Sequence, residues 1–187
     1  MTYSIGFRAP SVAQLLDASM EVILPQLTEE QRYGDPDLHS TLSPSRIDNE
    51  ATNRLAKLLT QTFSEPATLA KILGQLMTEA KYPESLPEPN LPITWEEWLA
   101  DTEVKTLMRH EHARFSYFTD DQQCLFFSHG ECTVLPKSCA PLVASLGDCR
   151  QYSKEQLQQL ATNDQGRQLL LQLLAQHMIY AESDTEG

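Results

Sequence analysis

The residues with the clearest metal-binding chemistry are two histidines and a glutamate in the second half of the chain. His129, Gly130 and Glu131 are followed downstream by His177. This is the order of a two-histidine, one-carboxylate Fe(II) site. Such a triad needs rigid strands to hold its ligands in place. Here the triplet lies at a predicted turn and His177 at a predicted helix end, so the sequence predicts no metal site from them.

Two further groups carry metal-ligand chemistry without the spacing that a metal site needs. The first group comprises His129, Cys132, Cys139 and Cys149. Imidazole and thiolate both suit zinc, but the gaps between these residues are longer and less regular than in paired-ligand sites. A second group, His110-Glu111-His112, lies between two predicted strands. A tight turn there would expose all three side chains rather than converge them.

Covalent catalysis and phosphate binding also lack their usual motifs. The sequence contains no glycine-rich phosphate loop, no Gly-x-Ser-x-Gly elbow and no cysteine in a recognisable nucleophile context. All four cysteines, Cys124 included, fall in the second half without a Cys-x-x-Cys pair, and we interpret them as thiols. The sequence therefore predicts no catalytic residue in this chain.

The charge of the chain argues against nucleic acid as a partner. The formal net charge is -12, and residues 83–187 carry sixteen Asp/Glu against seven Lys/Arg. An acidic surface repels phosphate backbones. The helices expected at 138–147 and 153–162 offer only Lys154, with Arg150 between them. We therefore expect no DNA binding, which disfavours a transcription regulator.

No run approaches the roughly 18 apolar residues of a membrane span, and no basic segment followed by an apolar leader is visible, so we expect a cytoplasmic protein.

The first element expected along the chain is a strand at residues 2–8. Apolar and small polar residues alternate from Thr2 to Arg8, and Pro10 closes the run. The next strand-like runs lie about a hundred residues later, which is far beyond ordinary connection lengths. The strand's partners are therefore expected upstream of Met1, although exchange onto a distant sheet stays open.

Three amphipathic helical patterns follow, and they predict a small bundle. Apolar residues recur at helical spacing over 12–27, 47–63 and 69–76, with Ser11 as the first N-cap and Pro25 ending or kinking the first helix. Three such helices rarely bury a stable core alone. We expect part of this apolar surface to pair with a second copy, giving a homodimer, or with a domain upstream.

A proline-rich segment at 83–92 separates this region from a second block. Thr94 and Glu97 form a capping-box pattern for a short helix. Strands are expected near 104–109, 113–118, 123–128 and 131–135, helices near 138–147, 153–162 and 164–178, and a last short strand at 178–181. The four strands are expected to form one antiparallel sheet or wing. Helices beside such a sheet predict an α+β fold of the winged-helix type, and other small α+β arrangements of the same elements stay open.

One run near the amino terminus resembles a known family. Tyr3-Ser4-Ile5-Gly6-Phe7-Arg8-Ala9-Pro10 is similar to the final barrel strand of the bacterial ribosomal oxygenases, which are JmjC-type cupins that hydroxylate an arginine of a ribosomal protein. Tyr33-Gly34-Asp35-Pro36-Asp37 resembles a loop segment of the same family. The resemblance implies the last strand of a truncated cupin barrel at 1–10, a helical dimerisation domain at 11–82, a linker at 83–92 and a winged-helix domain at 93–187.

The same resemblance implies where the chemistry of a full-length parent would lie. The family's His-x-Asp pair and distal histidine would precede Met1, so Fe(II) and 2-oxoglutarate are implied for the parent and no cofactor for this chain. Ser4, and secondarily Thr2, would face the barrel interior and help to hold 2-oxoglutarate; an ordinary strand role for both stays open.

The resemblance and the composition together lead to one functional hypothesis and one alternative. The first is a non-catalytic carboxy-terminal part of a 2-oxoglutarate- and Fe(II)-dependent ribosomal protein arginine hydroxylase. It would serve dimerisation and substrate placement, with a basic ribosomal protein as partner. The alternative is a stand-alone dimeric winged-helix scaffold that binds proteins. Whether the chain counts as an enzyme stays open.

Overall fold

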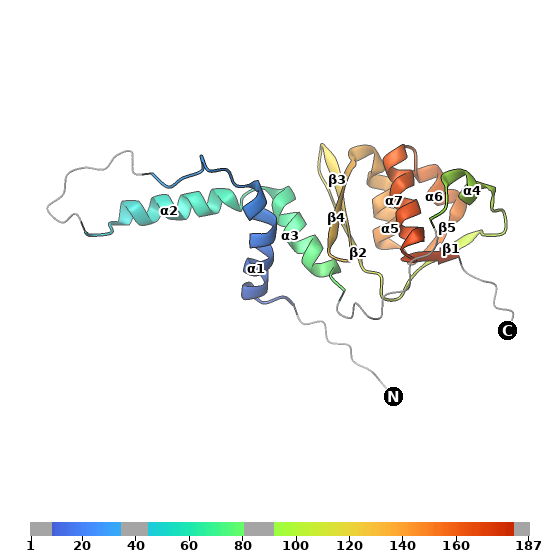
Figure 1. Cartoon of the computed structure of the whole chain (residues 1–187), viewed down its shortest axis with the longest axis horizontal. Coiled ribbons are helices and arrows are strands. Elements are labelled where there is room, and N and C mark those ends of the chain that lie inside the picture. Colours follow the sequence, from blue (N-terminus) through green and yellow to red (C-terminus); the bar gives the residue numbers. More distant parts are fainter. Residues whose placement is uncertain (1–8, 35–44, 81–91, 182–187) are drawn as a thin grey trace, which may run out of the picture. The chain divides into compact units, whose positions relative to one another are not determined.

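The computed structural model describes residues 9–34, 45–80 and 92–181 (Figure 1). The chain divides into two compact units, Met1–Ile72 and Leu73–Gly187. The strand predicted at 2–8, part of the Tyr33 loop motif and most of the proline-rich segment lie outside the described residues. No helix within the described ranges is both long and apolar enough to cross a bilayer.

The first unit consists of helices. They are α1 (Val12–Ile23), a short 3-10 helix η1 (Leu24–Gln26), α2 (Asn49–Thr62) and the first half of α3 (Pro66–Thr78). Ser11 caps α1 as predicted: its Oγ accepts from the Gln14 amide at 3.3 Å, and its own amide donates to Gln14 Oε1 at 2.9 Å. Pro25 lies in η1 directly after α1, which confirms the predicted helix end.

Most of the apolar side chains of these helices remain exposed. Among the described residues of this unit, the buried hydrophobic side chains are Ile23, Ala67 and Ile72. Helix α2 has no buried residue at all. The apolar spacing therefore predicted the helices correctly. Within a single chain, however, this unit leaves most of those apolar side chains exposed.

The second unit contains two small antiparallel sheets. One has the order β5-β1-β6 and the other the order β2-β3-β4. The strands are β1 (Thr106–Arg109), β2 (Phe115–Thr119), β3 (Gln123–Ser128), β4 (Glu131–Pro136), β5 (Gln151–Ser153) and β6 (Ile179–Ala181). The four strands predicted at 104–135 exist, but their assignment to one sheet is wrong, because β1 pairs with β5 and β6 instead of β2.

Four helices and a short 3-10 turn complete this unit. They are α4 (Trp95–Ala100), η3 (Lys137–Cys139), α5 (Ala140–Asp148), α6 (Lys154–Leu160) and α7 (Asp164–Ala175). Thr94 caps α4 with the predicted capping box, and Ser153 caps α6 as predicted. In Figure 1 the helices α5 and α7 stand between the β2-β3-β4 sheet and the strands β1 and β5. Three helices beside a small sheet, with the β3–β4 hairpin as the wing, make the predicted winged-helix arrangement.

The core of this unit explains why β3 lies in the middle of its sheet. Leu125, Phe126 and Phe127 are consecutive and all fully buried, so both faces of the strand are covered. Phe126 faces the helices and joins a core with Leu142, Leu146 and other apolar residues. Phe127 points to the opposite face.

The end of α3, which belongs to the same unit, covers that second face. A Cβ placed on Gly74 would lie 2.4 Å from the Phe127 ring, which shows how closely the helix backbone approaches the strand. Gln75 Nε2 donates to the Gly130 carbonyl at 3.0 Å, and the Gly130 amide donates to Thr78 Oγ1 at 3.2 Å. The wing hairpin is thus fixed at its tip by a helix of its own chain.

Candidate functional site

The residues predicted to hold 2-oxoglutarate, Ser4 and Thr2, lie outside the described residues. Their role therefore stays a prediction.

His129 and Glu131 lie at the tip of the wing. His129 and Gly130 occupy the left-handed region, with φ of 50° and 79°, which forms the tight turn between β3 and β4. Burial lowers the pKa of His129, His110 also lowers it, and the neighbouring Glu131 opposes the shift. Gly130 is held by Gln75 and Thr78, so the geometry at this triplet is that of an anchored turn.

The cysteines are distributed over different elements. Cys124 on β3 and Cys139 in η3 are buried, whereas Cys149 is exposed after α5. The side chain of Asn163 lies 3.3–3.4 Å from Cys139 Sγ. Within the ranges that the structure describes, no three or more His, Cys, Asp or Glu side chains are arranged to hold a metal ion.

The structure assembles a group of rings that the sequence analysis missed. The ring centroid of His110 lies 5.5 Å from that of His112, 6.1 Å from that of His177 and 6.1 Å from that of Tyr180. His177 and Tyr180 are 5.6 Å apart. We call these four residues the imidazole cluster. The expectation that the His110 turn exposes all three of its residues is wrong for His110, which is half-buried, and holds for Glu111 and His112.

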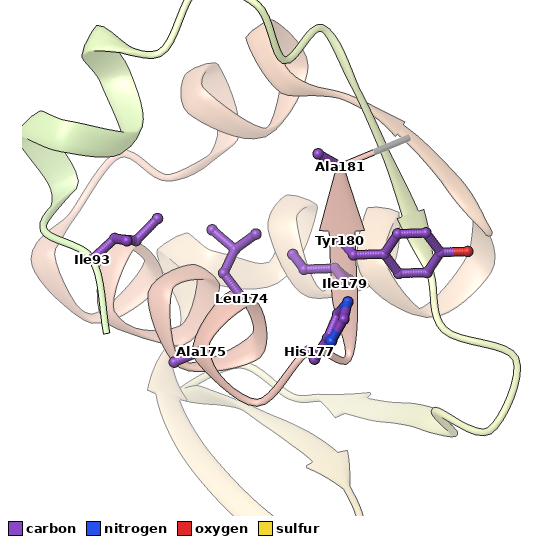
Figure 2. A pocket seen from close by; sticks show the side chains of 7 residues that line it. All are labelled: Ile93, Leu174, Ala175, His177, Ile179, Tyr180 and Ala181. Carbon is purple, nitrogen blue, oxygen red and sulfur yellow. The ribbon is translucent and has the colours of Figure 1, made fainter. Parts of the chain in front are cut away.

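A shallow pocket adjoins this cluster at the outer strand β6. Its cavity volume is about 350 Å³. The lining is mostly apolar and comprises Ile93, Leu174, Ala175, His177, Ile179, Tyr180 and Ala181. Figure 2 shows Ile93 and Leu174 on one side of β6 and the Tyr180 ring on the other. The lining has no carboxylate, and its apolar side chains can accept an apolar group beside His177 and Tyr180.

The comparison with protein families identifies the family of this chain. Residues 54–180 match the family described as ROXA-like winged helix. The chain belongs to the ROXA-like winged helix family. The winged-helix prediction is thereby confirmed.

One relative of known activity is a longer protein that resembles this chain over part of its length. The chain is 22% identical over 92 residues to the ribosomal protein uL16 3-hydroxylase of Escherichia coli (strain K12), and the match covers 49% of this chain and 25% of the relative. This sequence match confirms the predicted resemblance to the ribosomal oxygenases. The matched region is only a quarter of the curated relative.

Solved structures of the Escherichia coli ribosomal oxygenase YcfD share the fold. The structure with cobalt and succinic acid has a TM-score of 0.79 at 17% identity, covering 95% of this chain and 48% of that one. The structure with cobalt and 2-oxoglutarate has a TM-score of 0.75 at 17% identity, covering 96% and 48%. The chain thus spans about half the length of these YcfD chains.

Helix α7 of this ROXA-like winged helix follows α6 in the sequence, and in helix-turn-helix proteins that bind DNA the second helix of such a pair contacts the major groove. Its exposed positions are Asp164, Gln165, Gln168 and Gln172. Its one cation, Arg167, lies 3.5 Å from Asp164 and stacks 5.5 Å from the Trp95 ring. This helix presents amide and carboxylate groups where phosphate binding would need cations.

Proposed function

We propose that this chain is the non-catalytic carboxy-terminal part of a 2-oxoglutarate- and Fe(II)-dependent ribosomal protein arginine hydroxylase, where it serves dimerisation and substrate placement. The observation that carries the proposal is the family match over residues 54–180, together with a fold likeness that covers 95% of this chain but 48% of a YcfD chain. The described residues supply no iron ligand set, so no step of hydroxylation is assigned to them.

In this proposal the parts of the chain have separate tasks. Residues 1–10 contribute the last strand of a cupin barrel, 11–82 the dimerisation domain, 83–92 a linker and 93–187 the accessory winged helix. Ser4 and Thr2 would contact 2-oxoglutarate from the barrel strand. The whole protein would work in the cytoplasm, where a ribosomal protein substrate is made.

The argument for dimerisation rests on exposed apolar stripes. Val12 is 73% exposed and Leu16 52% exposed, and the i, i+4 row continues through Met20 on α1 to Leu24 in η1. Leu55 and Leu59 form a similar exposed pair on α2. Residues at this spacing share one helix face, and burying each large apolar side chain contributes roughly 1.5–3 kcal/mol. A second copy that covers these rows would recover this free energy.

The argument for substrate placement rests on charge and on the pocket. Residues 83–187 carry nine more acidic than basic side chains, which favours a basic protein partner through long-range attraction. The pocket beside β6 adds a place for an apolar side chain of that partner. Helix α7 supports the same view, because its single cation is engaged by Asp164 and Trp95.

Sedimentation equilibrium tests the dimerisation part of the proposal. The variant Leu16→Glu with Met20→Glu places two carboxylates in the exposed α1 row and should convert a dimer into a monomer. The matched control is Val134→Glu on β4, because Val134 is 51% exposed but lies in the other unit. A wild-type monomer, or a double variant that stays dimeric, would contradict the proposal.

A binding and turnover experiment tests the functional part. The chain is mixed with uL16 of Escherichia coli, Fe(II) and 2-oxoglutarate, and mass spectrometry looks for the gain of one oxygen atom while calorimetry measures binding. We expect binding without hydroxylation. Hydroxylation by the chain alone would overturn the non-catalytic assignment, and binding no tighter than that of a polylysine of matched charge would overturn substrate placement.

Reading the genome upstream of the Met1 codon separates the proposal from a stand-alone dimeric scaffold. An in-frame cupin with a His-x-Asp pair and a distal histidine is expected. Without it, the stand-alone protein-binding scaffold becomes the better explanation of the same dimer and the same acidic surface.

A further inference from the structure

The imidazole cluster joins two segments that are far apart in the sequence. His110 and His112 follow β1, whereas His177 and Tyr180 belong to the turn before β6 and to β6 itself. Antiparallel pairing of β1 with β6 brings them together, with Met108 opposite Tyr180. The three imidazole rings therefore lie at the place where the last described strand closes the β5-β1-β6 sheet.

Backbone hydrogen bonds prevent the rings from separating while the sheet is closed. The His110 amide donates to the Met178 carbonyl at 2.9 Å. The His177 and Met178 amides donate to the Leu174 and Leu173 carbonyls at 3.0 and 2.9 Å, and His177 has a φ of 55°. A tight left-handed turn of this kind leaves His177 little freedom to move away from His110.

The hydrogen bond at the His110 ring requires a neutral imidazole. The His112 amide donates to His110 Nδ1 at 3.3 Å, so this nitrogen must carry a lone pair. Protonation of His110 would place a hydrogen on Nδ1 and remove that bond. It would also place a positive charge 6.1 Å from the His177 ring and 5.5 Å from the His112 ring.

The groups around the cluster do little to compensate such a charge. Glu111 Oε1 lies 3.5 Å from His112 Nε2 and is exposed to solvent. From the wing, His129 adds a third imidazole neighbour, and Glu131 faces His129. The neighbouring Arg109 on β1 adds no negative charge, and its guanidinium donates to the Leu146 and Gly147 carbonyls.

We propose that the imidazole cluster is a pH-sensitive contact that holds β6: the neutral His110 ring keeps the strand against β1, and protonation of His110 loosens β6 and the pocket beside it. His177 and Tyr180 line that pocket, so its shape depends on the same closure. Acidification therefore changes the surface that the pocket presents.

The direction of the pH dependence follows from His110. Burial lowers the pKa of His110 from its ordinary value of 6.5, and His112 and His177 lower it further, against Glu111. A folded-state pKa below the unfolded value means that the neutral form stabilises the fold. This stabilisation is complete above about pH 6.5 and is lost as the pH falls below it.

Hydrogen exchange measured by mass spectrometry tests the proposal, with β5 as the internal control. Both β5 and β6 pair with β1 at opposite edges of one sheet, but only β6 carries the cluster. Between about pH 7.5 and pH 5.5, either side of the ordinary histidine pKa, protection of the β6 amides relative to β5 should fall about tenfold after correction for intrinsic exchange.

Two variants change the cluster while keeping local geometry. His110→Asn retains an acceptor for the His112 amide, and His177→Asn suits the left-handed turn. Each should reduce the tenfold change to less than about threefold, because the first removes the ring that titrates and the second removes a ring that lowers the pKa of His110. Equal pH responses of β5 and β6 in the wild type, or an unchanged response in both variants, would overturn the proposal. Should the variants unfold, a His110 pKa at or above 6.5 by NMR titration of the wild type would overturn it too.

Discussion

The two units of this chain treat their apolar residues in opposite ways. The winged-helix unit buries Phe126, Leu142 and Leu146 completely, whereas the helical unit leaves Leu16 about half exposed and α2 without a buried residue. The same amphipathic spacing underlies both regions. Spacing therefore shows which face of a helix is apolar, but only long-range packing shows whether the chain itself covers that face.

A core truncation gives the largest effect expected from this difference. Phe126→Ala removes a ring with no exposed surface that lies 5.2 Å from the ring of Phe115, so the free energy of unfolding should fall by about 3–5 kcal/mol. The matched change Leu16→Ala in the helical unit should cost less than about 1 kcal/mol in a monomer. Chemical denaturation followed by tryptophan fluorescence measures the first, because Trp95 and Trp98 both lie in the winged-helix unit.

A similar loss from Phe126→Ala and Leu16→Ala would remove the contrast between the units. A large loss from Leu16→Ala that depends on protein concentration would instead place Leu16 in a subunit interface, because dimer stability varies with concentration.

Adding a single methyl group gives the next largest effect. In an open helix Gly→Ala stabilises by about 1 kcal/mol, but at Gly74 the new Cβ would lie 2.4 Å from the Phe127 ring. Phe127 is itself buried and cannot yield, so overpacking should dominate and Gly74→Ala should cost about 1–2 kcal/mol. Gly34→Ala in the helical unit meets nothing within 4 Å and is the control. A more stable Gly74→Ala protein in thermal unfolding would show that α3 does not cover β3 in solution.

Helix caps provide the comparison with the smallest expected change in stability. Asn163 Oδ1 accepts from the Gly166 amide at 2.9 Å at the start of α7, and Asp48 Oδ1 accepts from the Ala51 amide at 2.7 Å at the start of α2. Replacing either with alanine removes about 1 kcal/mol of helix stability. Asn163→Ala should lower the melting temperature of the winged helix, whereas Asp48→Ala should only reduce helical circular dichroism. Equal shifts of the same unfolding transition would mean that the two units unfold together.

Local chemistry made the helices and the wing predictable from the sequence. The Ser11 and Thr94 caps, the Pro25 helix end and the β3–β4 hairpin each depend on residues within a few positions of one another. Strand β5 was missed because it has three residues, the last of which is the Ser153 cap, and so short a run carries no alternation to recognise. Its status as a strand comes from Leu107, which lies opposite Tyr152.

The candidate site was less predictable, because its residues come together only through strand pairing between distant parts of the sequence. Irregular spacing gave no grounds for expecting a metal site among the histidines and cysteines. The proximity of His110 and His177 was not expected, because it depends on the pairing of β1 with β6. Ser4 and Thr2 were inferred from a resemblance, and their role stays a prediction.

The pairing of β1 has a consequence for how the chain must fold. This central strand finds both neighbours much later in the chain, with Leu107 opposite Tyr152 and Arg109 opposite Ile179. During synthesis β1 therefore leaves the ribosome long before its sheet can exist, and loop closure over such separations slows folding. A chain released before Ile179 would keep the wing hairpin but leave one edge of β1 without its strand.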